Sequence, residues 1–191
     1  MRKLDATSYR TMPWKNGGGT TTEIARSPEV GSIDDFDWRL SMAQVGASGP
    51  FSRFPGVDRS IAILEGEGFL LVVEGRGETR LDRGAAPLSF PADVDISATL
   101  VGGSTEDLNV MTRRGRYRHL LTRARFDAPT TVASLGDVTI LVVARGMAAV
   151  RRACLTEELA PRDALVFEGG APLELLPHAE VELLTADLWR C

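Results

Sequence analysis

Short apolar or alternating segments, separated by turn-forming residues, recur along the whole chain, and this pattern constrains the fold more than any other feature. The separating segments 65–68, 74–77 and 168–170 are rich in glycine, which is a strong turn signal. No long segment keeps the period of an amphipathic helix. Many short strands at even spacing are typical of a β-sandwich or β-barrel, so we predict an all-β fold. The expected strands are residues 20–26, 37–45, 59–64, 68–73, 78–81, 87–90, 95–100, 107–112, 117–121, 130–133, 138–144, 147–152, 165–167, 173–176 and 181–186.

A weak internal repeat divides the chain in two. Residues 63–70 resemble residues 143–150, and residues 86–90 resemble residues 163–167 in the same order. This similarity predicts two related β-units, although chance similarity between β-rich segments would give the same pattern. No Pro/Ser-rich linker separates the halves, so we expect a single fused body. The expected N-terminal and C-terminal units are approximately residues 1–112 and 113–191.

The composition is that of an ordinary globular protein, with 191 residues of which 43% are apolar and 25% charged. No apolar run approaches the roughly 18–20 residues that cross a bilayer, and the first residues lack the pattern of a signal peptide. We therefore expect a cytoplasmic protein without membrane contact. The net charge of −4 argues against a nucleic acid as the main partner.

The densest polar motif has Lys15 and Asn16 before three consecutive glycines, with Thr20 after them. Gly17 and Gly18 allow backbone conformations in which successive N–H groups form an anion-binding nest. Lys15 adds a cation, and Asn16 adds a donor and an acceptor. The motif therefore suits a carboxylate or another small anion. A flexible turn with an exposed lysine is the alternative.

Two predicted strands carry polar side chains on one face. A period of two places Arg39 and Ser41 on the face opposite Trp38 and Leu40. In the same way, Asp107 and Asn109 share a strand face. Exposure to solvent and a place in the wall of a barrel cavity both fit this pattern. Such cavities are mainly apolar, with a few placed polar groups.

Arg59 follows a loop, residues 49–58, that contains two phenylalanines and two prolines. The arginine lies where this loop enters an apolar strand. An arginine at such a position can bind a carboxylate through two parallel hydrogen bonds. An ion pair with Asp58 or another acid is the alternative.

Six arginines lie between residues 113 and 125. Such a run can contact a nucleic acid or an acidic partner. The acidic balance of the chain and the absence of a nucleic-acid motif favour a solvated, arginine-rich edge strand instead. A protein-interaction module that uses this edge remains a third possible role for the chain.

The sequence predicts no metal and no other cofactor. His119 and His178 lie far apart and have no ligand spacing to each other or to Cys154. No G-x-S-x-G nucleophile elbow is present. If the protein is an enzyme, Glu23 and Asp107 are the candidate acid/base pair, but the sequence does not fix the distance between them.

Several ordered motifs span more than half of the chain, from about residue 14 to residue 112. They are Trp-Lys-Asn-Gly-Gly-Gly-Thr at 14–20 with a glutamate at 23, Trp-Arg-Leu-Ser at 38–41, Gly-Pro-Phe-Ser at 49–52, Phe-Pro-Gly-Val-Asp-Arg at 54–59 and Asp-Leu-Asn-Val-Met at 107–111. Together these motifs resemble the HutD/Ves family. The resemblance implies a cupin-type β-barrel or jelly roll, often described as a bicupin, and a role in histidine utilisation in bacteria. It also implies a pocket for a small ligand, proposed to be N-formyl-L-glutamate, and control of pathway flux without an established reaction.

The resemblance places the polar residues of the motifs in that pocket. Arg59 and Lys15 are expected to clamp a carboxylate, and Asn16 and Asn109 to bind an amide or formyl group. Supporting roles are expected for Arg39 and Asp107, with the acid orienting an arginine. The full set of expected ligand-binding residues is Lys15, Asn16, Gly17, Gly18, Thr20, Arg39, Ser41, Arg59, Asp107 and Asn109.

We therefore predict a metal-independent protein that binds an acidic amino-acid derivative and acts as a sensor or regulator of histidine utilisation. The alternative is a hydrolase or isomerase that acts on a small carboxylate in the same pocket. The open strand edges of a cupin also make a homodimer plausible.

Overall fold

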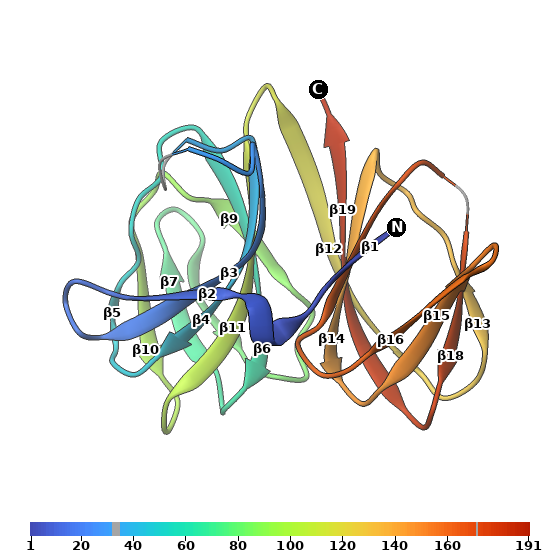
Figure 1. Ribbon diagram of the computed structural model, residues 1–191. Helices are drawn as coiled ribbons and strands as arrows, with labels where there is room; N and C mark the ends of the chain where they lie inside the picture. Colours follow the sequence, from blue (N-terminus) through green and yellow to red (C-terminus); the bar gives the residue numbers. More distant parts are fainter. Residues whose placement is uncertain (32–34, 171) are drawn as a thin grey trace. The chain divides into compact units, whose positions relative to one another are not determined.

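The computed structural model describes residues 1–31, 35–170 and 172–191. Figure 1 shows that nearly all regular structure in these ranges is β-strand, beside one short 3-10 helix, η1 (Ala6–Ser8). The all-β fold predicted from the strand pattern is therefore confirmed. The described residues contain no helix that is long and apolar enough to cross a membrane.

Each predicted strand overlaps an observed one, and four observed strands were not predicted: β1, β2, β5 and β16. The strands are β1 (Arg2–Leu4), β2 (Arg10–Pro13), β3 (Gly19–Ser27), β4 (Trp38–Val45), β5 (Gly49–Pro50), β6 (Val57–Glu65), β7 (Phe69–Val73), β8 (Gly77–Leu81), β9 (Leu88–Pro91), β10 (Ile96–Leu100), β11 (Thr105–Arg113), β12 (Tyr117–Phe126), β13 (Thr130–Val132), β14 (Val138–Arg145), β15 (Ala148–Arg152), β16 (Leu155–Leu159), β17 (Ala164–Glu168), β18 (Leu173–Pro177) and β19 (Val181–Arg190).

The chain divides into two compact units. The N-terminal unit contains Arg10–Arg118 and Cys191, and the C-terminal unit contains Met1–Tyr9 and His119–Arg190. These boundaries differ from the predicted ones near residue 112, chiefly because the first nine residues belong to the C-terminal unit.

Asp163 explains why the start of the chain joins the C-terminal unit. This aspartate is only 4% exposed, and its carboxylate accepts hydrogen bonds from the backbone N–H groups of Ala6 (2.9 Å) and Ala160 (3.0 Å). The ammonium group of Lys3 lies 3.1 Å from the same carboxylate. Strand β1 also pairs with β17. A buried carboxylate needs such partners, so these contacts fix the first residues.

Each unit consists of two antiparallel sheets. In the N-terminal unit the strand orders are β2-β3-β4-β11-β6-β9 and β5-β10-β7-β8. In the C-terminal unit they are β1-β17-β14-β19-β12 and β13-β18-β15-β16. The core of the N-terminal unit contains Ile61 and Ile63 from one sheet and Phe69 and Leu71 from the other, all fully buried. The two sheets of this unit therefore pack face to face, as in a β-sandwich.

The two units repeat the same strand pairing. The order β9-β6-β11-β4 in one unit corresponds to β17-β14-β19-β12 in the other, and β5-β10-β7-β8 corresponds to β13-β18-β15-β16. The repeated segments of the sequence fall at equivalent places, since residues 63–70 join β6 to β7 and residues 143–150 join β14 to β15. This agreement supports two related units, while the description of the chain as a bicupin stays a prediction.

Candidate ligand-binding site

The N-terminal unit contains a cavity of about 550 Å³. Its floor is formed by the central strands of the six-stranded sheet, and its rim by a turn at residues 14–18, the rim turn, and by the segment 50–54. The volume is typical of sites for small molecules, which run from roughly 300 to 1,000 Å³. The lining residues are Met12, Pro13, Trp14, Lys15, Asn16, Thr21, Arg39, Ser41, Ala43, Val45, Pro50, Phe51, Ser52, Phe54, Arg59, Asp107, Asn109 and Met111.

The strand register brings the polar residues of distant motifs to this floor. Met111 on β11 is paired with Arg39 on β4 and with Arg59 on β6. Asn109, two residues earlier on β11, is paired with Ser41. Because side chains on one strand face recur every second residue, these groups point to the same side of the sheet. The predicted period of two is therefore confirmed, and exposures of 4% for Arg39 and 3% for Ser41 rule out the solvent-facing alternative.

Arg59 is half-buried and presents a cation to the cavity. Its Nε donates a hydrogen bond to Asn109 Oδ1 at 2.7 Å, and its Nη2 donates to the same oxygen. The ring of Phe51 lies against the guanidinium group, 4.5 Å from ring centre to Cζ. A guanidinium has five N–H donors, and the other three have no acceptor among the described residues.

The alternative ion pair with Asp58 does not form, because Asp58 is bound by Arg114 at 2.9 Å. Burial lowers the pKa of Arg59 to about 10, so the side chain remains positively charged at neutral pH. Arg59 is thus oriented by Asn109 and Phe51 and keeps free donors for an anion.

Asn109 connects this cation to a buried acid. The amide nitrogen of Asn109 donates a hydrogen bond to Asp107 Oδ1, while its amide oxygen accepts from Arg59. Both ends of the amide are therefore engaged within the protein. Asn109 thus bridges Arg59 and Asp107, and its predicted role of binding an amide or formyl group stays a prediction.

Asp107 is 1% exposed, and its Oδ2 has no hydrogen-bond partner among the described residues. Burial raises the pKa of Asp107 from 3.8 to about 7, and the charge of Arg59 and the hydrogen bond from Asn109 oppose this rise only in part. Asp107 therefore titrates near neutral pH, where an ordinary aspartate is fully ionised.

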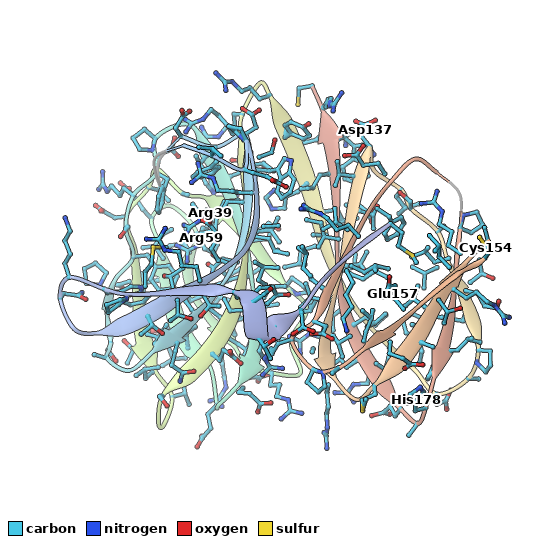
Figure 2. All side chains as sticks on the ribbon, in the orientation of Figure 1. Arg39, Arg59, Asp137, Cys154, Glu157 and His178 are labelled. Carbon is cyan, nitrogen blue, oxygen red and sulfur yellow. The ribbon has the colours of Figure 1, made fainter. Side chains whose placement is uncertain are left out.

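Arg39 is the second arginine of the floor, and Figure 2 shows it with Arg59 inside the N-terminal unit. Its Nε donates a hydrogen bond to Glu23 Oε2 at 2.8 Å. Its Nη2 is buried and has no partner among the described residues. Glu23, and not Asp107, is thus the acid that orients Arg39. Glu23 does not belong to the lining of the cavity, and no direct contact joins it to Asp107 in the described structure.

The rim turn carries the predicted cation but not the predicted anion-binding nest. Lys15 is exposed and makes no ion pair with a described residue. The N–H of Gly17 donates to the carbonyl oxygen of Trp14 (3.0 Å), and the N–H of Gly18 donates to Asn16 Oδ1 (3.0 Å). Because both N–H groups are used inside the turn, Gly17 and Gly18 shape the rim and are not available to a ligand.

Thr21 lines the cavity, whereas the predicted Thr20 does not. Thr21 is paired with Ala43 on β4, and its Oγ1 accepts a hydrogen bond from Trp14 Nε1 at 2.7 Å. Thr20 points to the opposite face because side chains alternate along β3. The sequence indicated the face of Thr21, because Thr21 and Glu23 are two residues apart and therefore lie on the same face of the predicted strand. Phe51, which packs on Arg59, also lines the cavity and had no predicted role.

The arginine run is largely paired with acids. Arg114 bonds Asp58 as described above, and both Arg123 and Arg125 contact the buried Glu182, at 3.0 and 2.8 Å. Strand β12 lies at the end of its sheet, as expected of an edge strand. A role of this edge in binding a partner stays a prediction.

The histidines and cysteines lie outside the cavity. His178 contacts Glu158 at 3.1 Å on the surface of the C-terminal unit, and Cys154 is exposed elsewhere in that unit (Figure 2). Within residues 1–31, 35–170 and 172–191, no group of three or more His, Cys, Asp and Glu side chains stands where it could hold a metal ion.

The cavity has a positive balance of charge. Arg39, Arg59 and Lys15 contribute three cations, and Glu23 neutralises the charge of Arg39. Asp107 is only partly ionised at neutral pH. A small anion with several acceptor atoms matches this arrangement, because guanidinium groups bind carboxylates through two parallel hydrogen bonds.

Paired antiparallel sheets around an internal cavity define the chain as a protein of the cupin fold. The cupin 2 conserved barrel domain protein from Leptotrichia buccalis superposes with a TM-score of 0.62 at 9% identity, over 92% of this chain and 91% of that chain. At this level of identity the similarity shows the fold alone.

The family is shown by closer relatives. The HutD family model matches residues 6–185, so the chain belongs to the HutD family, which is associated with histidine utilisation. A protein of 21.2 kDa encoded in the hutC 3′ region of Pseudomonas putida is 36% identical over 174 residues, 91% of this chain and 90% of that protein. The protein Ves of Citrobacter koseri is 38% identical over 70% of both chains. The structure of HutD from Pseudomonas fluorescens has a TM-score of 0.83 at 30% identity, over 100% of this chain and 98% of that chain.

Proposed function

We propose that the cavity of the N-terminal unit binds a small carboxylate, an acidic amino-acid derivative, and that the protein thereby senses or regulates histidine utilisation. The observation that carries the proposal is Arg59, a charged guanidinium that is held in place by Asn109 and Phe51 and keeps three N–H donors without an acceptor. A carboxylate that accepts hydrogen bonds from these donors and offsets the guanidinium charge is therefore favoured.

N-formyl-L-glutamate fits the chemistry of this cavity. It carries two carboxylates, which match Arg59 and the exposed Lys15 on the rim. Its formamide can donate and accept hydrogen bonds, which suits Ser41 and the amide of Asn16. The association of the family with histidine utilisation supports a ligand derived from histidine breakdown. The relative from Pseudomonas fluorescens was solved in a formate condition, which makes formate a useful minimal probe.

Calorimetric titration tests the proposal. Wild-type protein is titrated with N-formyl-L-glutamate, and with urocanate, glutamate and formate for comparison. Arg59→Ala removes two charge-assisted hydrogen bonds to the ligand, which should cost about 2–4 kcal/mol of binding free energy, roughly a 30- to 700-fold rise in Kd. Arg80→Ala, which removes an exposed arginine of the same unit, is the matched control and should bind like wild type. Equal loss of binding in the two variants would contradict a specific role of Arg59.

The second candidate is an enzyme that acts on a small carboxylate. The burial and raised pKa of Asp107 favour this candidate. A buried acid with a pKa near 7 suits general acid–base catalysis. Incubation of N-formyl-L-glutamate with the protein, followed by NMR of the ligand, distinguishes the two candidates. Unchanged ligand supports a binding protein, and product formation that is abolished by Asp107→Asn supports an enzyme.

A further inference from the structure

Two buried polar atoms in residues of the cavity wall are not used by the fold. Asp107 Oδ2 and Arg39 Nη2 lack hydrogen-bond partners among the described residues, although these side chains are only 1% and 4% exposed. Such atoms are uncommon in folded proteins, and each is costly unless a ligand satisfies it. Arg39 Nη2 can only donate. Asp107 Oδ2 accepts a hydrogen bond when the acid is ionised and donates one when it is protonated.

We propose that Asp107 binds the carboxylate ligand as a neutral acid, donating a hydrogen bond from Oδ2, so that the protein takes up a proton when the ligand binds. This inference rests on the proposed function, because it requires a carboxylate in the cavity. An ionised Asp107 would repel that carboxylate at close range. Protonation replaces the repulsion with a short, strong O–H···O⁻ hydrogen bond.

The charges around Asp107 favour this proton uptake. They are, by element, Arg59 on β6, Arg39 on β4, Glu23 on β3, Lys15 on the rim turn and Glu106 on β11 itself. Burial is the largest influence and favours the neutral acid, and Glu106 acts in the same direction. The charge of Arg59 favours the ionised acid. A ligand carboxylate on Arg59 would neutralise that opposing charge, so the proton is held more tightly in the complex.

The expected pH dependence follows from the fraction of protein in which Asp107 is protonated. With a pKa of about 7 in the free protein, this fraction is about 0.9 at pH 6, about 0.1 at pH 8 and about 0.01 at pH 9. Apparent affinity scales with the fraction of protein that is competent to bind. Affinity for a carboxylate should therefore fall about tenfold from pH 6 to pH 8 and about 100-fold from pH 6 to pH 9.

Calorimetry of the protein tests this inference with N-formyl-L-glutamate as the probe. Its carboxyl groups stay ionised throughout this range, so the ligand itself does not titrate. Titrations at pH 7.5 in phosphate and in Tris, which differ in ionisation enthalpy, report the protons taken up. We expect an uptake of about three quarters of a proton per bound ligand, because about a quarter of the free protein is already protonated at that pH.

Two variants assign the proton to its residue. Asp107→Asn is neutral at every pH and keeps a hydrogen-bond donor, so its Kd should agree within about twofold at pH 6 and pH 8, without proton uptake. Asp127→Asn, which changes an exposed aspartate, should keep the full pH dependence of wild type. A tenfold pH effect that persists in Asp107→Asn would overturn the inference.

Failure of this inference and failure of the proposed function give different results. Wild-type protein that binds equally well at pH 6 and pH 8 without proton uptake overturns the inference and leaves carboxylate binding intact. Absence of binding at pH 6 with both N-formyl-L-glutamate and formate overturns both. If Asp107→Asn does not fold, the proton uptake of wild-type protein alone shows whether ligand binding is coupled to protonation.

Discussion

Asp107 should make the stability of the protein depend on pH even without a ligand. Its pKa of about 7 in the folded protein lies above the value of 3.8 expected in the unfolded chain. Between these two pH values the folded protein keeps a proton that the unfolded chain has released. The free energy of unfolding therefore carries the full contribution of this group below about pH 4 and loses it as the pH rises to about 7. A shift of this size corresponds to about 4 kcal/mol at most.

Urea unfolding at pH 4.5 and pH 8 measures this contribution. Asp107→Asn replaces the acid with a neutral group of the same shape, so the variant should gain stability relative to wild type as the pH rises. The gain between the two pH values should approach about 3–4 kcal/mol. The exposed Asp127→Asn control should follow the wild-type profile. Identical pH profiles for wild type and Asp107→Asn would refute the argument, because they would show that Asp107 ionises normally in the folded protein.

Two further substitutions test how the floor is built. Glu23→Gln leaves the buried guanidinium of Arg39 without its anionic partner, so it should destabilise the protein by about 1–3 kcal/mol in urea unfolding at pH 7. A change below about 0.5 kcal/mol would show that this ion pair does not contribute to stability. Gly19→Ala adds a Cβ that would overlap the carbonyl oxygen of Gln44 on β4, so it should cost about 1–3 kcal/mol. Gly49→Ala, where a Cβ meets no atom within 4 Å, is the control and should be nearly neutral in the same assay.

The strand pattern of the sequence was sufficient to predict the class of fold. Runs such as residues 61–64 and 138–144 are mainly apolar and are followed by glycine-containing turns, and they lie in the buried strands β6 and β14. The missed strands lack such a pattern. Residues 155–159 have three polar residues between two leucines, and they pair with β15 as strand β16, while β1 pairs with β17. Strands that are specified by a partner and not by their own side chains are not visible in a sequence.

The membership of the site was easier to predict than the roles of its residues. Alternation along one strand placed Arg39 with Ser41, and Asp107 with Asn109, on shared faces. Which arginine meets which acid depends on the register between strands, and the sequence does not contain that information directly. The structure pairs Arg39 with Glu23 and leaves Asp107 connected to its arginine only through an amide. The raised pKa of Asp107 also depends on burial in the folded sheet, so it could not be predicted from a local sequence motif.

The most direct test of carboxylate binding is a crystal structure of the protein with N-formyl-L-glutamate, grown near pH 6. We predict a ligand carboxylate in the cavity of the N-terminal unit, with its oxygens within hydrogen-bonding distance of Arg59 Nη1 and Nη2. A ligand that occupies the cavity without touching Arg59, or that binds only elsewhere on the protein, would contradict the account.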